Sequence, residues 1–169
     1  PDSKPVGLGV FGQTLLVLTT GRPLIVQGST PDGMDQQPLE MSQGCVAARS
    51  VVSMGSGVAW ASEDGLCWYG AGGARVLTNG VMLREDWQAL VPSSIVGKMY
   101  EGLYLGSYND GFGRKGFIVD PNGGGIYFLD TGYSAMYFDS LKDQLYVLTG
   151  TNVGKWDTGT SMTYRSRSK

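Results

Sequence analysis

The chain has 169 residues, a formal net charge of −2 and no histidine. This length allows one domain with a sizeable core, and 41% hydrophobic residues beside 17% charged ones argue against disorder. Lys and Arg gather only in the tail, at Arg165, Arg167 and Lys169, so the broad basic surface that nucleic-acid binding needs is missing.

Three further properties concern the whole chain. Glycine occurs 27 times, about twice its ordinary usage, so the chain turns often. No run approaches eighteen apolar residues, and we expect no membrane-spanning segment. Because the chain starts at Pro1 and stops at Lys169, we expect a fragment of a longer chain, folded as a single all-β domain over residues 1–169.

Four segments share one plan, in which an apolar run, a polar or glycine turn and a second apolar run follow one another. They are residues 15–26, 58–70, 103–120 and 145–156. Their starts at 15, 58, 103 and 145 are 43, 45 and 42 residues apart, close to the roughly 40 to 45 residues of a four-stranded propeller blade. The pattern predicts an all-β fold, a β-propeller or part of one, with about four blade-like repeats of 42–45 residues; the blade number stays open.

Shorter elements are expected between these hairpins. Further strands are predicted at 6–11, 50–54, 74–77, 95–100, 125–129 and 134–138. Residues 28–43 have no periodicity and are predicted to be a loop used for contacts. Residues 83–90 place Leu83, Trp87 and Leu90 at helical spacing before Val91-Pro92, which predicts one short helix.

The second hairpin carries the sequence Ser62-Glu63-Asp64-Gly65 at its turn. It resembles the Asp-box of sialidase-like propellers, although here Gly65 follows Asp64 directly. In that motif the aspartate binds the backbone of the turn and takes no part in catalysis. We therefore expect Ser62, Asp64 and Gly65 to shape the turn, and Trp60 and Trp68 to pack between sheets.

Catalysis and metal binding have little support. Without histidine, the usual general base and the commonest metal ligand are missing. Acidic residues near predicted turns could pair as in glycoside hydrolysis, but turns favour Asp for backbone hydrogen bonds in any case. These residues are Glu63, Asp64, Asp110, Asp120 and Asp130. We expect no enzyme, with no catalytic, metal or cofactor-binding residues and no cofactor; an enzyme with paired carboxylates remains a third hypothesis.

Three other short stretches have some features of a binding site. Residues 109–113 and 120–125 are rich in oxygen ligands but lack the twelve-residue register of a calcium loop. Residues 70–74 are rich in glycine but lack the Lys-Ser/Thr end of a phosphate-binding loop. We interpret all three as turns or strand connections.

Cysteines and aromatic residues complete the candidates. Cys45 and Cys67 form no metal pattern and are expected to be buried thiols, with their pairing left open. Four aromatic residues lie near turns, where a rim could offer them to sugars or other partners. They are Trp68, Tyr69, Tyr104 and Tyr108. Aromatic residues are also common in strands and cores, so we favour core positions and keep the rim contacts as the alternative.

Five phrases of the sequence together resemble structural proteins of tailed-bacteriophage virions. They are residues 19–28, 45–55, 61–65, 73–78 and 84–94. Their order and spacing match as well as their wording. The resemblance is to the propeller-bearing tail proteins of the nozzle or hub class, and it covers roughly residues 6–157.

This resemblance implies a virion component, assembled in the host cytoplasm, whose propeller packs beside copies of itself and other phage tail proteins around the DNA channel. It implies no catalytic residues and no sequence-specific contact with nucleic acid. The absence of a strongly basic face suits a channel wall past which DNA must slide. The alternative is a sugar-binding propeller, involved in host recognition, that uses exposed Trp and Tyr.

Overall fold

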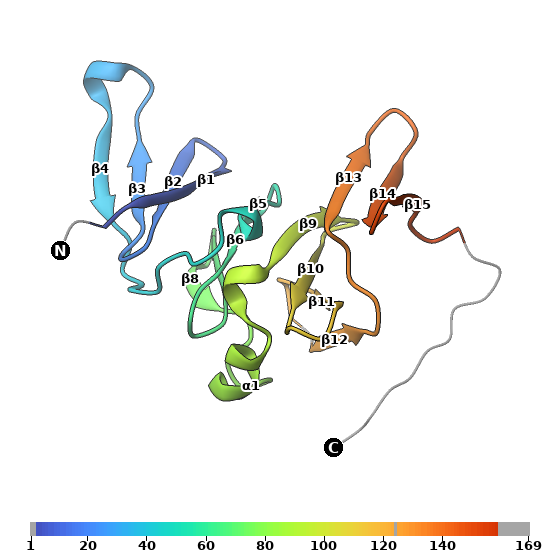
Figure 1. Ribbon diagram of the computed structural model, residues 1–169. Helices are drawn as coiled ribbons and strands as arrows, with labels where there is room; N and C mark the ends of the chain where they lie inside the picture. Colours follow the sequence, from blue (N-terminus) through green and yellow to red (C-terminus); the bar gives the residue numbers. More distant parts are fainter. Residues whose placement is uncertain (1–2, 124, 159–169) are drawn as a thin grey trace.

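Four antiparallel sheets follow one another along the chain in the computed structural model, which describes residues 3–123 and 125–158 (Figure 1). The first contains β1 (Pro5–Phe11), β2 (Thr14–Thr19), β3 (Leu24–Gln27) and β4 (Asp35–Pro38). The second contains β5 (Val52–Ser53), β6 (Gly57–Ala61), β7 (Leu66–Gly70) and β8 (Gly73–Val76). The third contains β9 (Val96–Tyr100), β10 (Leu103–Asn109), β11 (Arg114–Val119) and β12 (Ile126–Leu129). The fourth contains β13 (Ala135–Asp139), β14 (Gln144–Thr149) and β15 (Asn152–Lys155).

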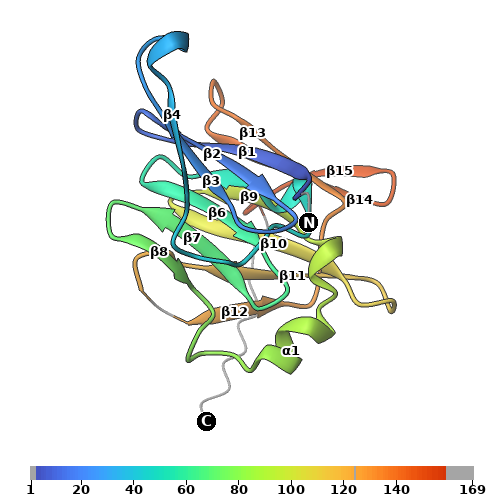
Figure 2. The same cartoon turned by 90° about the vertical axis from the view of Figure 1, so that its left-hand side faces the viewer.

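Each sheet is a meander in which every strand pairs with the next along the chain. The first strands of the four sheets are neighbours, since β1 contacts β5, β5 contacts β9, and β9 contacts β13. The sheets therefore form a row in chain order, with the first and fourth sheets at its opposite ends (Figure 1). Figure 2 has the first sheet nearest the viewer.

Strand residues point alternately to opposite sides of a sheet. Every residue of β6 and nearly every residue of β7 is buried, so the second sheet is covered on both faces. On one side, Trp60 packs with Leu16 and Leu18 of the first sheet. On the other side, Trp68 belongs to a cluster with Tyr104 and Phe117 of the third sheet. The two tryptophans thus pack between sheets as predicted, each in a different interface.

A third cluster joins the third and fourth sheets. It contains Leu105, Leu145 and Val147, which are all buried. At its edge the rings of Tyr100 and Phe138 lie 5.8 Å apart. The sheets therefore pack face against face throughout the row, and the apolar core is divided among three interfaces.

Glycine permits the closest approach between the first two sheets. A Cβ atom added to Gly9 of β1 would overlap the side chain of Val58 on β6. Only a residue without a side chain fits there, so the position explains why an apolar strand contains a glycine.

The short helix α1 (Arg84–Ala89) lies between the second and third sheets in the sequence, as predicted. Its Trp87 is buried and meets the ring of Phe117 edge to face at 5.9 Å. The helix stops where Val91 takes a left-handed backbone conformation, φ 55°, before Pro92. Within the described ranges there are also three 3₁₀ helices, at Pro31–Gly33, Ala48–Ser50 and Pro92–Ser94.

The expectation of an all-β chain with one short helix is confirmed, and each of the four predicted hairpins forms. The prediction of a loop at 28–43 is wrong in part, because this segment contains β4. The four residues of β4 are all exposed, and the strand lies at the edge of the first sheet. The strand predicted at 50–54 shortens to Val52–Ser53, since a 3₁₀ turn occupies Ala48–Ser50. The basic tail at 165–169 lies outside the described residues.

Candidate functional site

The turn between β6 and β7 is organised by the hydroxyl of Ser62, which is buried. Its Oγ accepts hydrogen bonds from the backbone N–H groups of Asp64 and Gly65, at 3.1 and 3.2 Å, and donates to the Gly65 carbonyl at 2.9 Å. One short side chain thus satisfies three polar backbone groups, which stabilises the tight turn. Ser62 and Gly65 therefore shape the turn as predicted.

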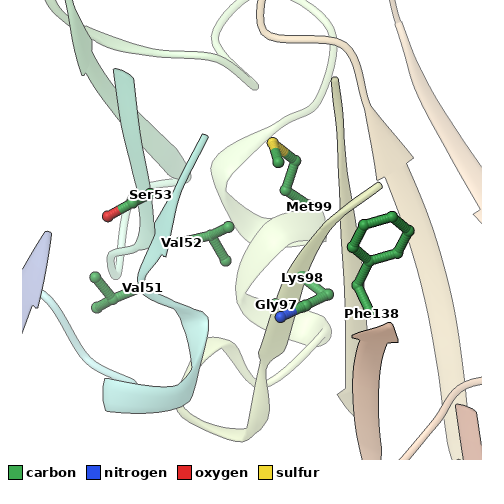
Figure 3. A pocket seen from close by; sticks show the side chains of 7 residues that line it. All are labelled: Val51, Val52, Ser53, Gly97, Lys98, Met99 and Phe138. Atoms are coloured by element: carbon green, nitrogen blue, oxygen red, sulfur yellow. The ribbon is translucent and has the colours of Figure 1, made fainter. Parts of the chain in front are cut away.

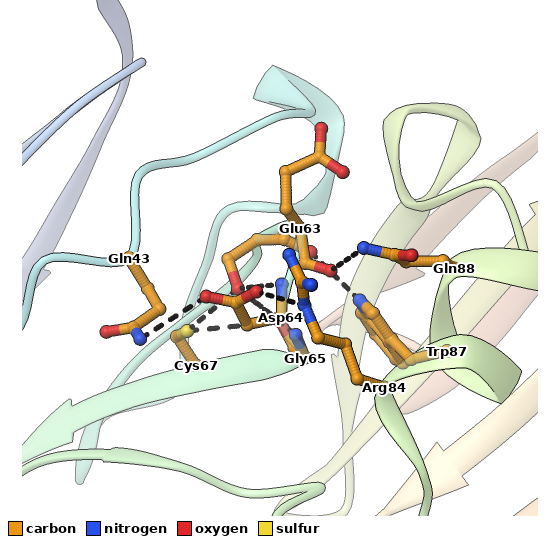
Figure 4. Close-up of polar contacts among 9 residues, drawn as sticks. Gln43, Glu63, Asp64, Gly65, Cys67, Arg84, Trp87 and Gln88 are labelled. Atoms are coloured by element: carbon orange, nitrogen blue, oxygen red, sulfur yellow. Dashed lines mark hydrogen bonds and ion pairs between the residues drawn. The ribbon is translucent and has the colours of Figure 1, made fainter.

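The side chain of Asp64 has a different role from the one expected of an Asp-box aspartate. Its carboxylate accepts hydrogen bonds from Arg84 Nε at 2.7 Å and from Gln43 Nε2 at 3.4 Å (Figure 4). It therefore bridges α1 and the segment after β4, and none of its oxygens binds the backbone of the turn among the described contacts. With side-chain exposures of 64% for Arg84 and 40% for Asp64, this ion pair adds little stability.

Helix α1 is attached to the same turn through its tryptophan. Trp87 Nε1 donates to the Ser62 carbonyl at 2.9 Å, and Gln88 Nε2 donates to the Glu63 carbonyl at 3.4 Å (Figure 4). The polar groups around the turn thus hold one another and the helix. This cluster is a structural junction, and the second acidic side chain in it, Glu63, makes no described contact with Asp64.

The two cysteines are free and buried. Burial raises the pKa of the Cys67 thiol to about 12, and its Sγ donates to Ser62 Oγ at 3.3 Å. Burial also raises the pKa of the Cys45 thiol. Both groups stay protonated near neutral pH, where only the thiolate is a nucleophile or a metal ligand.

The acidic residues in the other candidate loops bind their own turns. Asp110 accepts from Lys115 Nζ and from the Phe112 N–H, at 2.8 and 2.9 Å, and the hydrogen bond from Lys115 lowers the pKa of its carboxyl group. Asp120 accepts from the Asn122 N–H at 2.8 Å. Within residues 3–123 and 125–158, no group of three His, Cys, Asp or Glu side chains is placed to hold a metal ion.

The aromatic residues proposed as rim contacts have mainly core positions, which corrects that prediction. Trp68, Tyr104 and Tyr108 are 4%, 0% and 5% exposed, so they offer no ring face to a sugar. Tyr104 donates its hydroxyl to the Ser50 carbonyl at 2.9 Å and stacks on Phe117. Tyr69 is half-buried against the edge of Phe11. The physical reason is that the second and third sheets each have a neighbour on both sides.

A cavity of about 300 Å³ opens beside the first strands of the second, third and fourth sheets (Figure 3). Its lining consists of Val51, Val52, Ser53, Gly97, Lys98, Met99 and Phe138. Lys98 is the one charged residue in this lining, and no acid or base partner accompanies it. The cavity therefore has no pair of groups for acid–base chemistry.

The outer faces of the two end sheets are the most distinctive surfaces. On the first sheet, the face turned away from the second sheet, called here the leading face, carries residues that the strand register places on one side. They are Leu8, Val10, Leu15, Val17, Leu24 and Val26, with Gln36 and Pro38 of β4. Leu8 and Val10 are 63% and 54% exposed, whereas the Leu and Val residues of β2 and β3 are half-buried. None of these residues is charged, and six of the eight are Leu or Val.

The fourth sheet has a corresponding outer surface, called here the trailing face. The strand register places Ala135, Tyr137, Tyr146, Leu148 and Val153 on it, together with Asp139, Gln144 and Lys155, so this face mixes apolar and charged side chains. Tyr137 and Val153 are 65% and 70% exposed, although their strand neighbours pack against the third sheet. Sequence reasoning assigned these strands but missed both faces, because alternation in one strand does not tell which of its two sides is covered.

In comparisons with known proteins, no protein-family model matches the chain and no curated protein matches it. Among the described residues, none of the helices has the length and apolar character needed to cross a membrane.

Proposed function

We propose that this chain is a structural component of a bacteriophage tail, of the nozzle or hub class, in which the four sheets act as blades of a β-propeller or of part of one. Propeller blades are four-stranded meanders arranged around a common axis. Four meanders in chain order, with their first strands as neighbours, agree with such an arrangement. The fourth meander has three strands among the described residues.

The observation that carries this proposal is that apolar packing continues from each sheet to the next along the whole row. Repeats of this kind gain stability from their neighbours rather than from their own small cores. A chain built in this way is suited to assembly. In the virion it would join copies of itself and neighbouring tail proteins around the DNA channel.

Chemistry at the polar cluster supports a structural role over a catalytic one. The acids of the candidate loops bind turns or Arg and Lys, and the thiols are buried and protonated. A net charge of −2 also suits a wall near DNA, because dense positive charge would hold the phosphates in place.

The test is quantitative peptide mass spectrometry on phage particles purified by density from the source, or from an induced prophage lysate. The proposal predicts that peptides of this chain travel with the particles at a fixed low ratio to the major capsid protein. An abundant soluble host protein from the same lysate is the control for contamination. Loss of the chain from particles, at the rate of this control, would contradict the proposal, and a glycan array would then test the sugar-binding alternative.

A further inference from the structure

We propose that the outer edge of β12 binds an extended segment of a partner protein, which joins the third sheet as an added strand. The inference goes beyond the proposed function, because it concerns the edge of one strand and does not depend on how the four sheets surround an axis. In Figure 1 β12 lies at the outer margin of the third sheet, and β11 is its one strand neighbour among the described residues.

The composition of β12 differs from that of the corresponding outer strands in the first and second sheets. Positions 126–129 are Ile, Tyr, Phe and Leu, without a charge, a proline or a glycine. By contrast, β4 contains Asp35 and Pro38, and β8 contains Gly73 and Arg75. Charge, proline and glycine in an edge strand discourage pairing with another chain. All three strands have four residues, so what distinguishes β12 is the lack of this protection.

The strand register decides which backbone groups of β12 face outward. Glu101 and Gly102 have φ of 51° and 77° and form the two-residue turn between β9 and β10. A turn of this type makes the residues on its two sides a hydrogen-bonded pair, and such pairs alternate along antiparallel strands with pairs that are not hydrogen-bonded. Followed through β10 and β11, this alternation turns the N–H and C=O groups of Ile126 and Phe128 outward. The backbone groups of the residues between and after them bind β11.

A hydrogen bond beside β12 supports this assignment. The carbonyl of Arg114, which has the same orientation on β11 as that of Ile118, accepts from the Gly132 N–H at 2.8 Å. Outside the strand pairings, no backbone–backbone hydrogen bond among the described residues involves Ile126 or Phe128. Four polar backbone groups are therefore free at this edge, and an antiparallel strand beside it would satisfy all four.

The side chains of β12 favour a protein strand over a sugar. Tyr127 and Phe128 are 54% and 51% exposed, and consecutive strand residues point to opposite sides of a sheet. Their rings therefore form no common platform for a sugar, whereas the alternating side chains of an added strand would contact both. Asp130 is exposed directly after β12 and has no ion pair among the described residues. The partner segment is thus apolar in its middle, with a Lys or Arg at the end beside Asp130.

The probe is the peptide acetyl-Lys-Thr-Val-Thr-Val-Thr-Lys-amide, whose first Lys lies beside Asp130 and whose valines lie beside Phe128 and Ile126 in the antiparallel arrangement. Amide exchange of the isotope-labelled full chain is measured by NMR with and without it. In the free chain we expect rapid exchange at Ile126 and Phe128 and slow exchange at Tyr127. The peptide should bind with a Kd below about 1 mM and slow the exchange at Ile126 and Phe128 at least about tenfold.

A matched peptide with N-methyl groups on both valines keeps every side chain but lacks the two N–H donors that face β12, so it should not bind. In the protein, Phe128→Pro removes an outward N–H that the pairing with β11 does not use, and should raise the Kd at least about tenfold. Phe128→Ala keeps this N–H and should raise the Kd less. If circular dichroism shows that Phe128→Pro fails to fold, the N-methylated peptide makes the same test on the parent chain.

The charge at the end of β12 is tested separately. Asp130→Lys should raise the Kd of the peptide, because it replaces an attraction by a repulsion. Asp86→Lys is the matched control, since Asp86 is an exposed acid on α1, and it should bind the peptide like the parent chain.

Three results would overturn the proposal. They are equal binding of the N-methylated peptide, slow exchange at Phe128 and rapid exchange at Tyr127 in the free chain, and no binding of the probe peptide. None of them bears on the proposed function, which is decided by the presence of the chain in purified particles. Absence of the chain from particles would likewise leave the strand-binding edge unaffected.

Discussion

The second sheet and the two end sheets are built from similar meanders, yet they differ in what surrounds them. In the second sheet every residue of β6 is buried, and its two tryptophans serve two different interfaces. In the first sheet one side of β2 is buried, but Leu8 and Val10 of β1 face outward. The difference teaches that burial in this chain comes from the contacts between sheets rather than from any one sheet alone.

The largest expected effect is at the interface between the second and third sheets. Phe117→Ala removes a fully buried ring that meets Trp87, Tyr104 and Tyr108, and should lower the free energy of unfolding by about 3 to 5 kcal/mol in a urea titration. Phe128→Ala is the matched control, because Phe128 is the cross-strand partner of Phe117 but is 51% exposed. If both variants lowered the free energy of unfolding by the same amount, the burial of Phe117 between the second and third sheets would not be what stabilises this interface.

The next effect tests the close approach of the first and second sheets. Gly9→Ala should cost about 1 to 3 kcal/mol, because the new methyl group overlaps Val58. Val58→Ala in the same chain should restore part of the loss, which a double-mutant cycle measures. Gly125→Ala, where nothing lies within 4 Å of the added atom, is the control and should have little effect. If Val58→Ala adds its own loss without any rescue, the two sheets do not meet at this point.

A smaller effect is expected at the hairpin turns. Ser62→Ala removes three hydrogen bonds to the backbone of the turn and one from the Cys67 thiol, and should cost about 1 to 3 kcal/mol, by thermal or urea unfolding. In the first sheet Thr19, the last residue of β2, makes two hydrogen bonds in the turn before β3: it accepts from the Gly21 N–H and donates to the Arg22 carbonyl. Thr19→Val should therefore cost less. The reverse order would mean that the hydroxyl of Ser62 does not organise its turn.

The smallest effect is electrostatic and depends on pH. The hydrogen bond from Lys115 lowers the pKa of Asp110 in the folded protein, so this pair stabilises the fold above the usual Asp range and loses its contribution as the pH falls through the lowered pKa. Asp110→Asn should slightly reduce the melting temperature at neutral pH and leave it unchanged in acid, below both pKa values. A difference between variant and parent that grows as the pH falls would contradict this sign.

Local features of the sequence were sufficient for the hairpins, since apolar runs flanked by Gly, Asn and Asp carry their own turn chemistry. They were insufficient for β4, because Asp-Gln-Gln-Pro is an exposed edge strand without an apolar residue. They could not decide between core and rim for Trp68, Tyr104 and Tyr108, because the burial of these residues depends on neighbouring sheets that no local pattern reveals. The ion-pair partner of Asp64, Arg84, is twenty residues further along the chain, so no local pattern could predict this contact.

Hydroxyl-radical footprinting of the folded chain tests most directly the claim that the core is divided among the interfaces between sheets. The account predicts that Trp60, Tyr104 and Phe117, which are fully buried, are protected, whereas Leu8 and Tyr137, which are 63% and 65% exposed, react readily. Phe112 and Leu141, which are 93% and 97% exposed at turns, give the reactivity of uncovered side chains. Equal modification of the buried and the exposed aromatic rings would contradict this division of the core.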